Sequence, residues 1–312
     1  MRIKMMLKHA NAICYSGYRE GQCPRAGVYP SYQQVKEDLL LLADDWQLLR
    51  LYDCGPHAEL VLSVIEQEQL SFNIMLGADI GAEVSNPNCP WGAEFSEQKL
   101  RENSLSNEQQ IEKLIEFANK YPNIISSVSI GNEASVDWTD HLVPVERLIY
   151  YVKKIKAVIA QPVTFCENYV PWTTKLAPLV AELDFISIHT YPAWEYQSLE
   201  SALAYTKENY YSVANAYPDK QTVITEAGWT TQSNGRGIET WNASEEHQAQ
   251  YYQELMAWTN QEQILTFIFE AFDEPWKGSG HPQEPEKHWG LYFENRQPKK
   301  VLQNQYDRKK IA

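Results

Sequence analysis

Eight short apolar runs recur along the 312-residue chain, and most of them lead into polar or aromatic residues. Helical patterns or loops fill the gaps between the runs. This alternation is typical of a parallel sheet, in which each strand needs a crossover before the next one. Eight units in this length predict the α/β class and one domain, 1–312, folded as a single closed (β/α)₈ TIM barrel. The runs lie at 12–15, 48–52, 72–77, 124–130, 163–166, 185–188, 221–225 and 264–269.

Four of the gaps carry apolar residues at helical spacing behind a residue that can start a helix. Ser31 and Asn107 are the predicted N-caps of two helices, and Pro144 and Ser244 stand at the start of two more. A long loop is expected at 86–103, after the third run. Another is expected at 278–285, after the eighth.

The carboxyl ends of the strands hold the active site in a barrel of this kind. Glu133 follows the fourth apolar run and Glu226 follows the seventh, each close to a glycine. Two carboxylates that face one site are what acid–base cleavage of a glycosidic bond requires. A lone glutamate after a strand is better explained as part of a solvated loop. The matched pair favours catalysis.

The composition narrows the range of partners. A net charge of −14 argues against nucleic acid or an anionic membrane as the partner and is compatible with a neutral substrate. The 10 tryptophans and 19 tyrosines exceed what a core needs and suit the faces of sugars. The 5 cysteines include no CxxC, and the His281–His288 region lacks zinc spacing. We therefore expect mostly reduced thiols, no metal and no cofactor.

The beginning of the chain does not resemble a leader peptide. Residues 1–8 are basic but contain no uninterrupted apolar core. No stretch of the sequence is long and apolar enough to span a membrane.

The motifs at the strand ends resemble glycoside hydrolase family 17, the β-1,3-glucanases. Gly131-Asn132-Glu133 is similar to the fourth-strand motif of that family, and Thr225-Glu226-Ala227-Gly228-Trp229 is similar to the seventh. The resemblance runs from about residue 12 to about residue 300. Asp273-Glu274-Pro275-Trp276 departs from the Asp-Glu-Asn pattern of plant members. Further similar stretches lie at 12–15, 50–53, 189–192, 267–274 and 286–292.

The resemblance implies a retaining hydrolase in which Glu133 is the general acid/base and Glu226 the nucleophile. Glu133 must then hold a proton near neutral pH, and hydrogen bonds must keep Glu226 ionised. Asn132 would bind the sugar 2-hydroxyl, although a local Asx turn would also explain it. Tyr191 would donate its hydroxyl to Glu226, with core packing as the alternative. His189 is expected to support these groups through a hydrogen bond.

The remaining candidates would contact the substrate. Glu274, Lys277 and Glu286 either form a charged network beside the acid/base or belong to a solvated face. Tyr52 and Asn168 stand at strand ends. Several rings could stack on glucosyl units, and for each of them core packing is an equal alternative. These rings are Tyr15, Trp172, Trp194, Trp229 and Trp276.

The expected substrate is β-1,3-glucan, as polysaccharide and oligosaccharides, cleaved in endo fashion by a monomer. Such a substrate implies a secreted or periplasmic location. A β-1,3-glucanosyltransferase would share both carboxylates. A non-catalytic glucan-binding barrel would be expected to lack one of them. Product analysis separates the first two functions.

Overall fold

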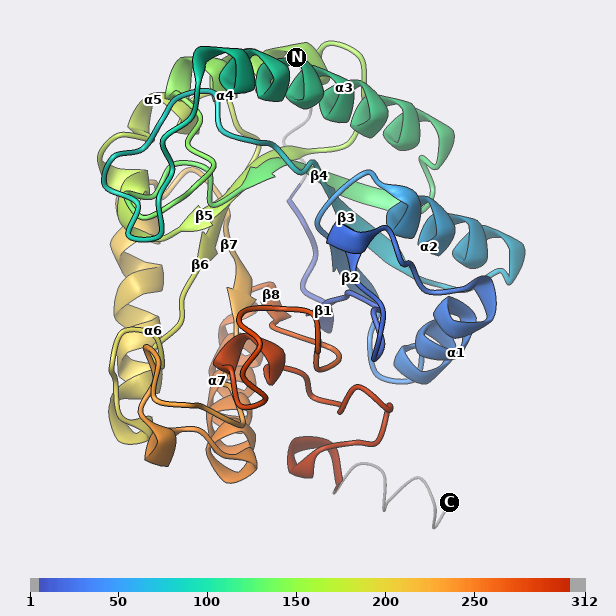
Figure 1. The fold of residues 1–312 in the computed structure, drawn as a ribbon, viewed down its shortest axis with the longest axis vertical. Coiled ribbons are helices and arrows are strands. Elements are labelled where there is room, and N and C mark those ends of the chain that lie inside the picture. The colour runs from blue at the N-terminus through green and yellow to red at the C-terminus, as the bar shows by residue number, and fades with distance from the viewer. Residues whose placement is uncertain (1–5, 304–312) are drawn as a thin grey trace.

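The computed structural model describes residues 6–303 and contains a closed barrel of eight parallel strands surrounded by helices (Figure 1). Each strand pairs with the next in sequence, and β8 pairs with β1 to close the barrel. The predicted (β/α)₈ barrel is therefore confirmed. Residues 1–5, which belong to the segment assessed as a leader peptide, lie outside the described range. The strands are β1 (Ala12–Cys14), β2 (Leu48–Leu51), β3 (Asn73–Gly77), β4 (Ile125–Asn132), β5 (Val163–Asn168), β6 (Ile186–His189), β7 (Thr222–Ala227) and β8 (Thr266–Ile268).

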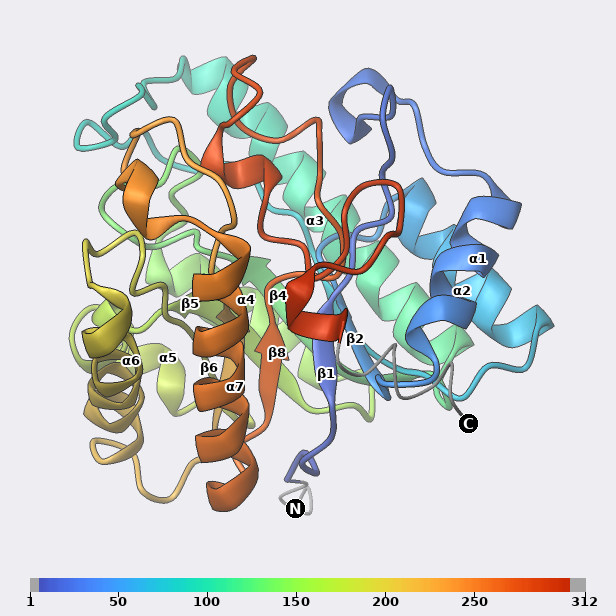
Figure 2. The same cartoon turned by 90° about the horizontal axis from the view of Figure 1, so that it is seen from below.

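Helices follow most strands and cover the outside of the barrel. In Figure 2 the segment that leads into β1 lies below that strand, and the long loop that follows β8 lies at the opposite end. That end is formed by the carboxyl ends of the strands, so the loops after the strands gather there. The helices are α1 (Tyr32–Leu42), α2 (Pro56–Gln67), α3 (Glu97–Lys120), α4 (Val145–Lys156), α5 (Ala177–Val180), α6 (Leu199–Ala214) and α7 (Glu245–Glu262). Four 3-10 turns lie at η1 (Pro24–Ala26), η2 (Val170–Thr173), η3 (Thr240–Asn242) and η4 (Pro285–Lys287).

Three of the four predicted helix starts are confirmed. Ser31 caps α1 in a reciprocal capping box with Gln34. Ser244 caps α7 and accepts a hydrogen bond from the His247 backbone N–H. Pro144 is the N-cap residue of α4, where its fixed φ suits the entry of the chain. Local side-chain chemistry decides these starts, which is why the sequence reveals them.

The predicted cap at Asn107 is wrong. The N-cap of helix α3 is Ser96, eleven residues earlier, and the helix begins at Glu97, so the expected loop also ends earlier. None of residues 97–106 is buried, and no apolar period could have revealed this half of the helix. Asn107 is buried inside α3 instead. Its side chain donates to the Gly81 carbonyl at 2.9 Å and accepts from the Gly81 N–H at 2.7 Å, which fixes the loop after β3.

Register shifts interrupt three strand pairs close to the predicted catalytic residues. They fall between Ser129 and Asn132 in β4, between Ile188 and His189 in β6, and between Ile224 and Ala227 in β7. Since side chains alternate between the two faces of a strand, an extra residue re-aims everything beyond it. The shifts therefore decide how Asn132, His189 and Glu226 are presented at the mouth of the barrel.

Within the described part of the chain, no helix combines the length and apolar character needed to cross a membrane.

Candidate active site

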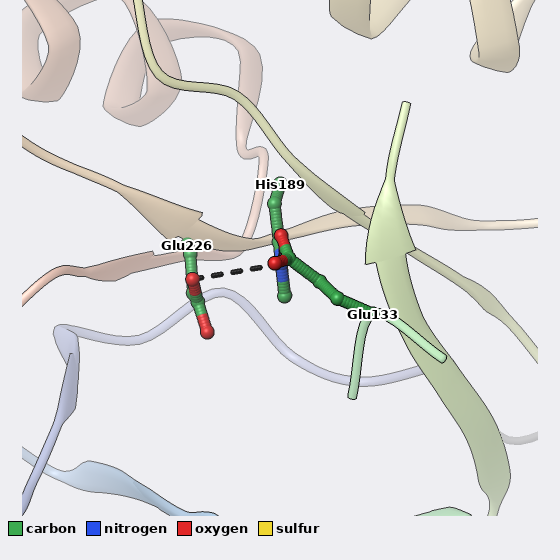
Figure 3. A group of neighbouring side chains, drawn as sticks. All are labelled: Glu133, His189 and Glu226. Atoms are coloured by element: carbon green, nitrogen blue, oxygen red, sulfur yellow. Dashed lines mark hydrogen bonds and ion pairs between the residues drawn. The ribbon is translucent and has the colours of Figure 1, made fainter. Parts of the chain in front are cut away.

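The two predicted catalytic glutamates meet at the mouth of the barrel, on either side of His189 (Figure 3). One carboxylate oxygen of Glu133 and one of Glu226 lie within 4.8 Å of each other. His189 Nδ1 lies 2.8 Å from Glu133 Oε1 and 3.5 Å from Glu226 Oε2. Strands β4, β6 and β7 thus deliver an acid–imidazole–acid cluster to one point.

Glu226 is buried and surrounded by hydrogen-bond donors. Arg50 and Tyr52 from the β2 side donate to its Oε1 at 2.5 and 3.0 Å, and the Tyr191 hydroxyl donates to its Oε2 at 2.5 Å. The expected contact from Tyr191 is therefore confirmed. Burial by itself would raise the pKa of Glu226, but His189, Arg50 and these hydrogen bonds outweigh it and lower the pKa to about 2. Glu226 is an anion at any physiological pH.

The backbone after Glu226 needs the glycine that follows. A Cβ at Gly228 would lie 2.0 Å from the Phe269 carbonyl oxygen, so any side chain would push β7 away from the chain at the end of β8. Gly228 therefore keeps the strand end that carries Glu226 against its neighbour.

Glu133 is more accessible than Glu226. Its side chain is 29% exposed, against 7% for Glu226. Its backbone adopts φ +46°, in the left-handed region that costs a non-glycine residue about 1–2 kcal/mol. The Glu133 N–H donates to the Cys166 carbonyl of β5 at 2.9 Å, which helps to hold this conformation. The turn directs the partly exposed Glu133 carboxyl group beside the buried Glu226 carboxylate.

His189 is fully buried between the two glutamates. Burial alone would lower its pKa, but Glu226, Cys166 and Glu133 together raise it to about 10. His189 is thus an imidazolium that donates from Nδ1 to Glu133, which confirms its expected supporting role. The three residues also offer atoms close enough to share a cation.

Asn132 and Glu226 share Arg50. The Arg50 Nη2 group donates to Asn132 Oδ1 at 2.5 Å. The amide oxygen is therefore occupied, and the amide N–H groups are the part of Asn132 left to meet a ligand. This orientation suits donation to a sugar hydroxyl and does not require the Asx turn considered as the alternative.

A second charged network lies after β8. Lys277 forms ion pairs with Glu274 and with Glu270, whose carboxylate is 2.8 Å from the Lys277 Nζ. Both glutamates are buried, and burial together with the charge of Glu274 raises the pKa of Glu270 well above its usual value. Burial also raises the pKa of Glu286, and Lys277 opposes this rise. The carboxyl groups of Glu133, Glu284 and Glu226 raise the pKa further. The expected network of Glu274, Lys277 and Glu286 is thus electrostatically connected, and Glu270 belongs to it.

Several expected sugar contacts are wrong, because the structure uses those side chains elsewhere. Trp172, Trp229 and Tyr15 are 0%, 1% and 1% exposed and present no ring face to a ligand. Trp229 Nε1 donates to the Asn242 carbonyl at 2.7 Å, and the Tyr15 hydroxyl donates to Asp38 at 3.2 Å. Large rings fill the space between barrel and loops because their area makes them efficient core residues.

Two smaller expectations change in the same way. Asn168 Oδ1 accepts from the Val170 N–H at 3.0 Å and closes a local Asx turn. Tyr52 holds Glu226 and packs against Arg50, whose guanidinium carbon lies 4.3 Å from the ring centroid. Trp276 and Trp194 remain partly exposed. The Trp276 Nε1 group donates to Glu274 at 2.9 Å, which places that ring beside the second charged network.

Reasoning from the sequence missed three buried charged residues as members of the site, namely Arg50, Glu167 and Glu270. Arg50 lies within the otherwise apolar strand Leu48–Leu51, and a charge in such a strand is a signal that it has a partner. Glu167 and Glu270 also stand at or near strand ends and are 0% and 1% exposed. Their partners belong to other elements, which the sequence alone does not identify.

Comparisons with known proteins show a family match and similar folds. The model of the BtgE/BtgC glycoside hydrolase domain matches residues 12–290. The btgC protein of Aspergillus niger, whose name assigns it provisionally as a glucan endo-1,3-β-glucosidase, is 27% identical over 285 residues, 84% of this chain. A glucan 1,3-β-glucosidase of Arthroderma benhamiae is 28% identical over 130 residues, 37% of this chain. The matches span only 38% and 41% of the lengths of these two curated relatives.

Solved structures share the fold. An endo-laminarinase from Formosa Hel1_33_131 superposes with a TM-score of 0.83 at 24% identity, covering 96% of this chain and 87% of that one. A glycoside hydrolase family 17 β-1,3-glucanosyltransferase from Rhizomucor miehei gives 0.72 at 21% identity, covering 93% and 95%. Both likenesses concern the barrel itself.

Proposed function

The chain belongs to the BtgE/BtgC glycoside hydrolase domain family, and from this we propose that it hydrolyses β-1,3-glucosidic bonds in laminarin-type glucan with retention of configuration. One observation carries the mechanism. The Glu133 and Glu226 carboxylates approach within 4.8 Å, which leaves no room for a water molecule between Glu226 and the anomeric carbon of the sugar. Carboxyl groups about 5–5.5 Å apart belong to retaining enzymes, and about 6.5–9.5 Å to inverting ones.

Each residue then has a distinct task in a double displacement. Glu226, kept ionised by Arg50 and Tyr191, attacks the anomeric carbon and forms a glucosyl ester. Glu133 passes a proton to the departing glycosidic oxygen. In the second step Glu133 takes a proton from water, and the water oxygen displaces Glu226 from the anomeric carbon. Asn132 donates to the 2-hydroxyl of the sugar being transferred.

The identity of the glucan is supported by the names of the two fungal relatives, both of which specify a β-1,3-glucosidic bond. The substrate is neutral, which is compatible with a net charge of −14. A transferase reaction on the same carboxylates would replace water by a second glucan chain in the deglycosylation step. Glycoside hydrolase family 17 membership and endo action form part of the same proposal.

The test uses proton NMR of the first reducing ends released from laminarin, read before mutarotation. Retention predicts that the β-anomer appears first. An initial α-anomer would overturn both the mechanism and the role of Glu226. Sizing the products at high oligosaccharide concentration separates the two reactions, because products longer than the substrate arise only by transfer.

A further inference from the structure

Residue Glu133 requires an unusual backbone conformation, and β5 supplies the groups that hold it. Its φ of +46° is disfavoured for a residue with a side chain. A left-handed residue of this kind persists only where neighbouring contacts hold it. The contact at Glu133 itself is its N–H bond to the Cys166 carbonyl at 2.9 Å. This bond leaves the following residues of the turn to be held by something else.

The Glu167 carboxylate holds them. Its Oε2 accepts from the Ser135 backbone N–H at 2.8 Å and from the Ser135 hydroxyl at 2.7 Å. Its Oε1 accepts from the backbone N–H of Asn168 at 2.7 Å. One carboxylate thus connects the residue two places after Glu133 to the end of β5, with both of its oxygens in use.

Glu167 is buried, and within residues 6–303 no cationic side chain donates a hydrogen bond to it. It is 0% exposed, and the groups that donate to it are backbone N–H groups and one hydroxyl. A buried carboxylate with such partners is costly and is retained where its position matters. Burial raises its pKa to about 7, the nearby Glu133 carboxyl group adds to the rise, and Ser135, Asn168 and His189 oppose it.

We infer that Glu167 is a positioning residue for Glu133: by clasping Ser135 to the end of β5, it holds the left-handed turn that aims the acid/base at the glycosidic oxygen. The inference rests on the proposed function, in which Glu133 transfers the proton. Glu167 itself touches neither the substrate nor the reacting atoms.

The test compares two substrates that differ in their need for a proton. One is laminarin-type glucan, whose leaving sugar must be protonated. The other is an aryl β-glycoside with an acidic phenol, whose departure needs little protonation. The readout on the second is the burst of phenol in the first turnover, since later turnovers also use Glu133 as a base.

Glu167→Ala is expected to lower glucan turnover roughly 10²-fold, the loss caused by a misplacement of about 1 Å. The rate of the first-turnover phenol burst should fall far less. Glu167→Gln keeps one acceptor oxygen but turns N–H donors towards either Ser135 or Asn168. The glutamine variant should therefore lose less glucan turnover than the alanine variant, and its phenol burst should again be affected far less than its glucan turnover. If the alanine variant does not fold, the glutamine variant decides.

Glu83→Gln is the matched control. Glu83 is a 6%-exposed carboxylate bonded to Arg147, Tyr151 and Asn107, outside the catalytic cluster. Its substitution should lower stability, but it should not reduce glucan turnover more than it reduces the phenol burst. Equal losses on both substrates in the Glu167 variants, or glucan turnover at the wild-type rate, would overturn the inference. Failure of Glu133→Gln to separate the substrates would instead overturn the proposed function.

Discussion

Arg50 Nη1 donates to Glu226 Oε1 at 2.5 Å, and the two side chains are only 2% and 7% exposed. The same guanidinium also bonds Asn132 and the Thr225 carbonyl. One buried cation therefore orients Glu226, the Asn132 amide and the backbone carbonyl next to Glu226. Arg suits this task because its planar group presents several donors at fixed angles.

Arg50→Met is expected to cost about 3–5 kcal/mol of unfolding free energy, because it leaves the Glu226 charge buried without its partner. The pKa of Glu226 should rise, so the acid limb of kcat/KM should move to higher pH. Arg50→Lys keeps the positive charge but loses the planar set of N–H donors. It should therefore be closer to the wild type in stability than in catalytic rate. Chemical denaturation and a pH–rate profile measure both effects, and an unshifted acid limb would contradict this role for Arg50.

Glu133 and Glu226 should fail in different ways when substituted. Glu133→Gln should slow glucan hydrolysis by about 10²–10⁴-fold, the usual contribution of general acid catalysis, while an aryl glycoside with an acidic leaving group suffers less in its first turnover. Glu226→Ala should lose nearly all turnover and still bind oligosaccharide, as calorimetry would show. Hydrolysis at the wild-type rate by either variant would remove the carboxylate concerned from the mechanism.

Trp229 and Trp276 should respond oppositely to truncation. Trp229→Ala removes a fully buried ring and its bond to Asn242, and is expected to cost about 3–5 kcal/mol of stability. Trp276→Ala removes a partly exposed ring beside Glu274, so it should raise KM for glucan several-fold at nearly unchanged stability. Thermal unfolding and KM are measured on both variants. A KM effect confined to Trp229→Ala would reverse the assignment.

Stability should depend on pH through the His189 cluster. The pKa of His189 is raised from 6.5 to about 10 in the folded state, so its stabilising contribution is complete below pH 6.5 and is lost as pH rises towards 10. The pKa of Glu226 is lowered from 4.5 to about 2, so its contribution is present above pH 4.5 and is lost as pH falls towards 2.

The matched variant is His189→Asn, which cannot be charged. It should be less stable than the wild type near pH 6, with the difference shrinking as pH approaches 10. Denaturant unfolding at several pH values measures that difference directly. A difference that stays constant from pH 6 to pH 10 would show that His189 is not held as an imidazolium.

The barrel and the pair of glutamates that meet at its mouth were readable from the sequence for a physical reason. Burial makes strands apolar, and the loops after them are polar, so eight runs and their endings appear directly in the chain. Ser31 and Ser244 mark helix starts because capping is a local interaction within one turn. Position at the carboxyl ends of the fourth and seventh strands was enough to select Glu133 and Glu226, and the family resemblance supplied the separate roles proposed for them.

Only the tertiary structure decided which neighbours those residues meet. Trp229 and Trp276 both closely follow a buried glutamate, Glu226 and Glu274 respectively, yet one ring is in the core and the other is partly exposed. Glu167 and Arg50 act on residues 32 and 176 positions away, through contacts that no local pattern encodes. Register shifts in β4, β6 and β7 set the final directions of the side chains. Local sequence determines where a strand or helix lies, whereas charge, burial and aim depend on contacts between strands far apart in the chain.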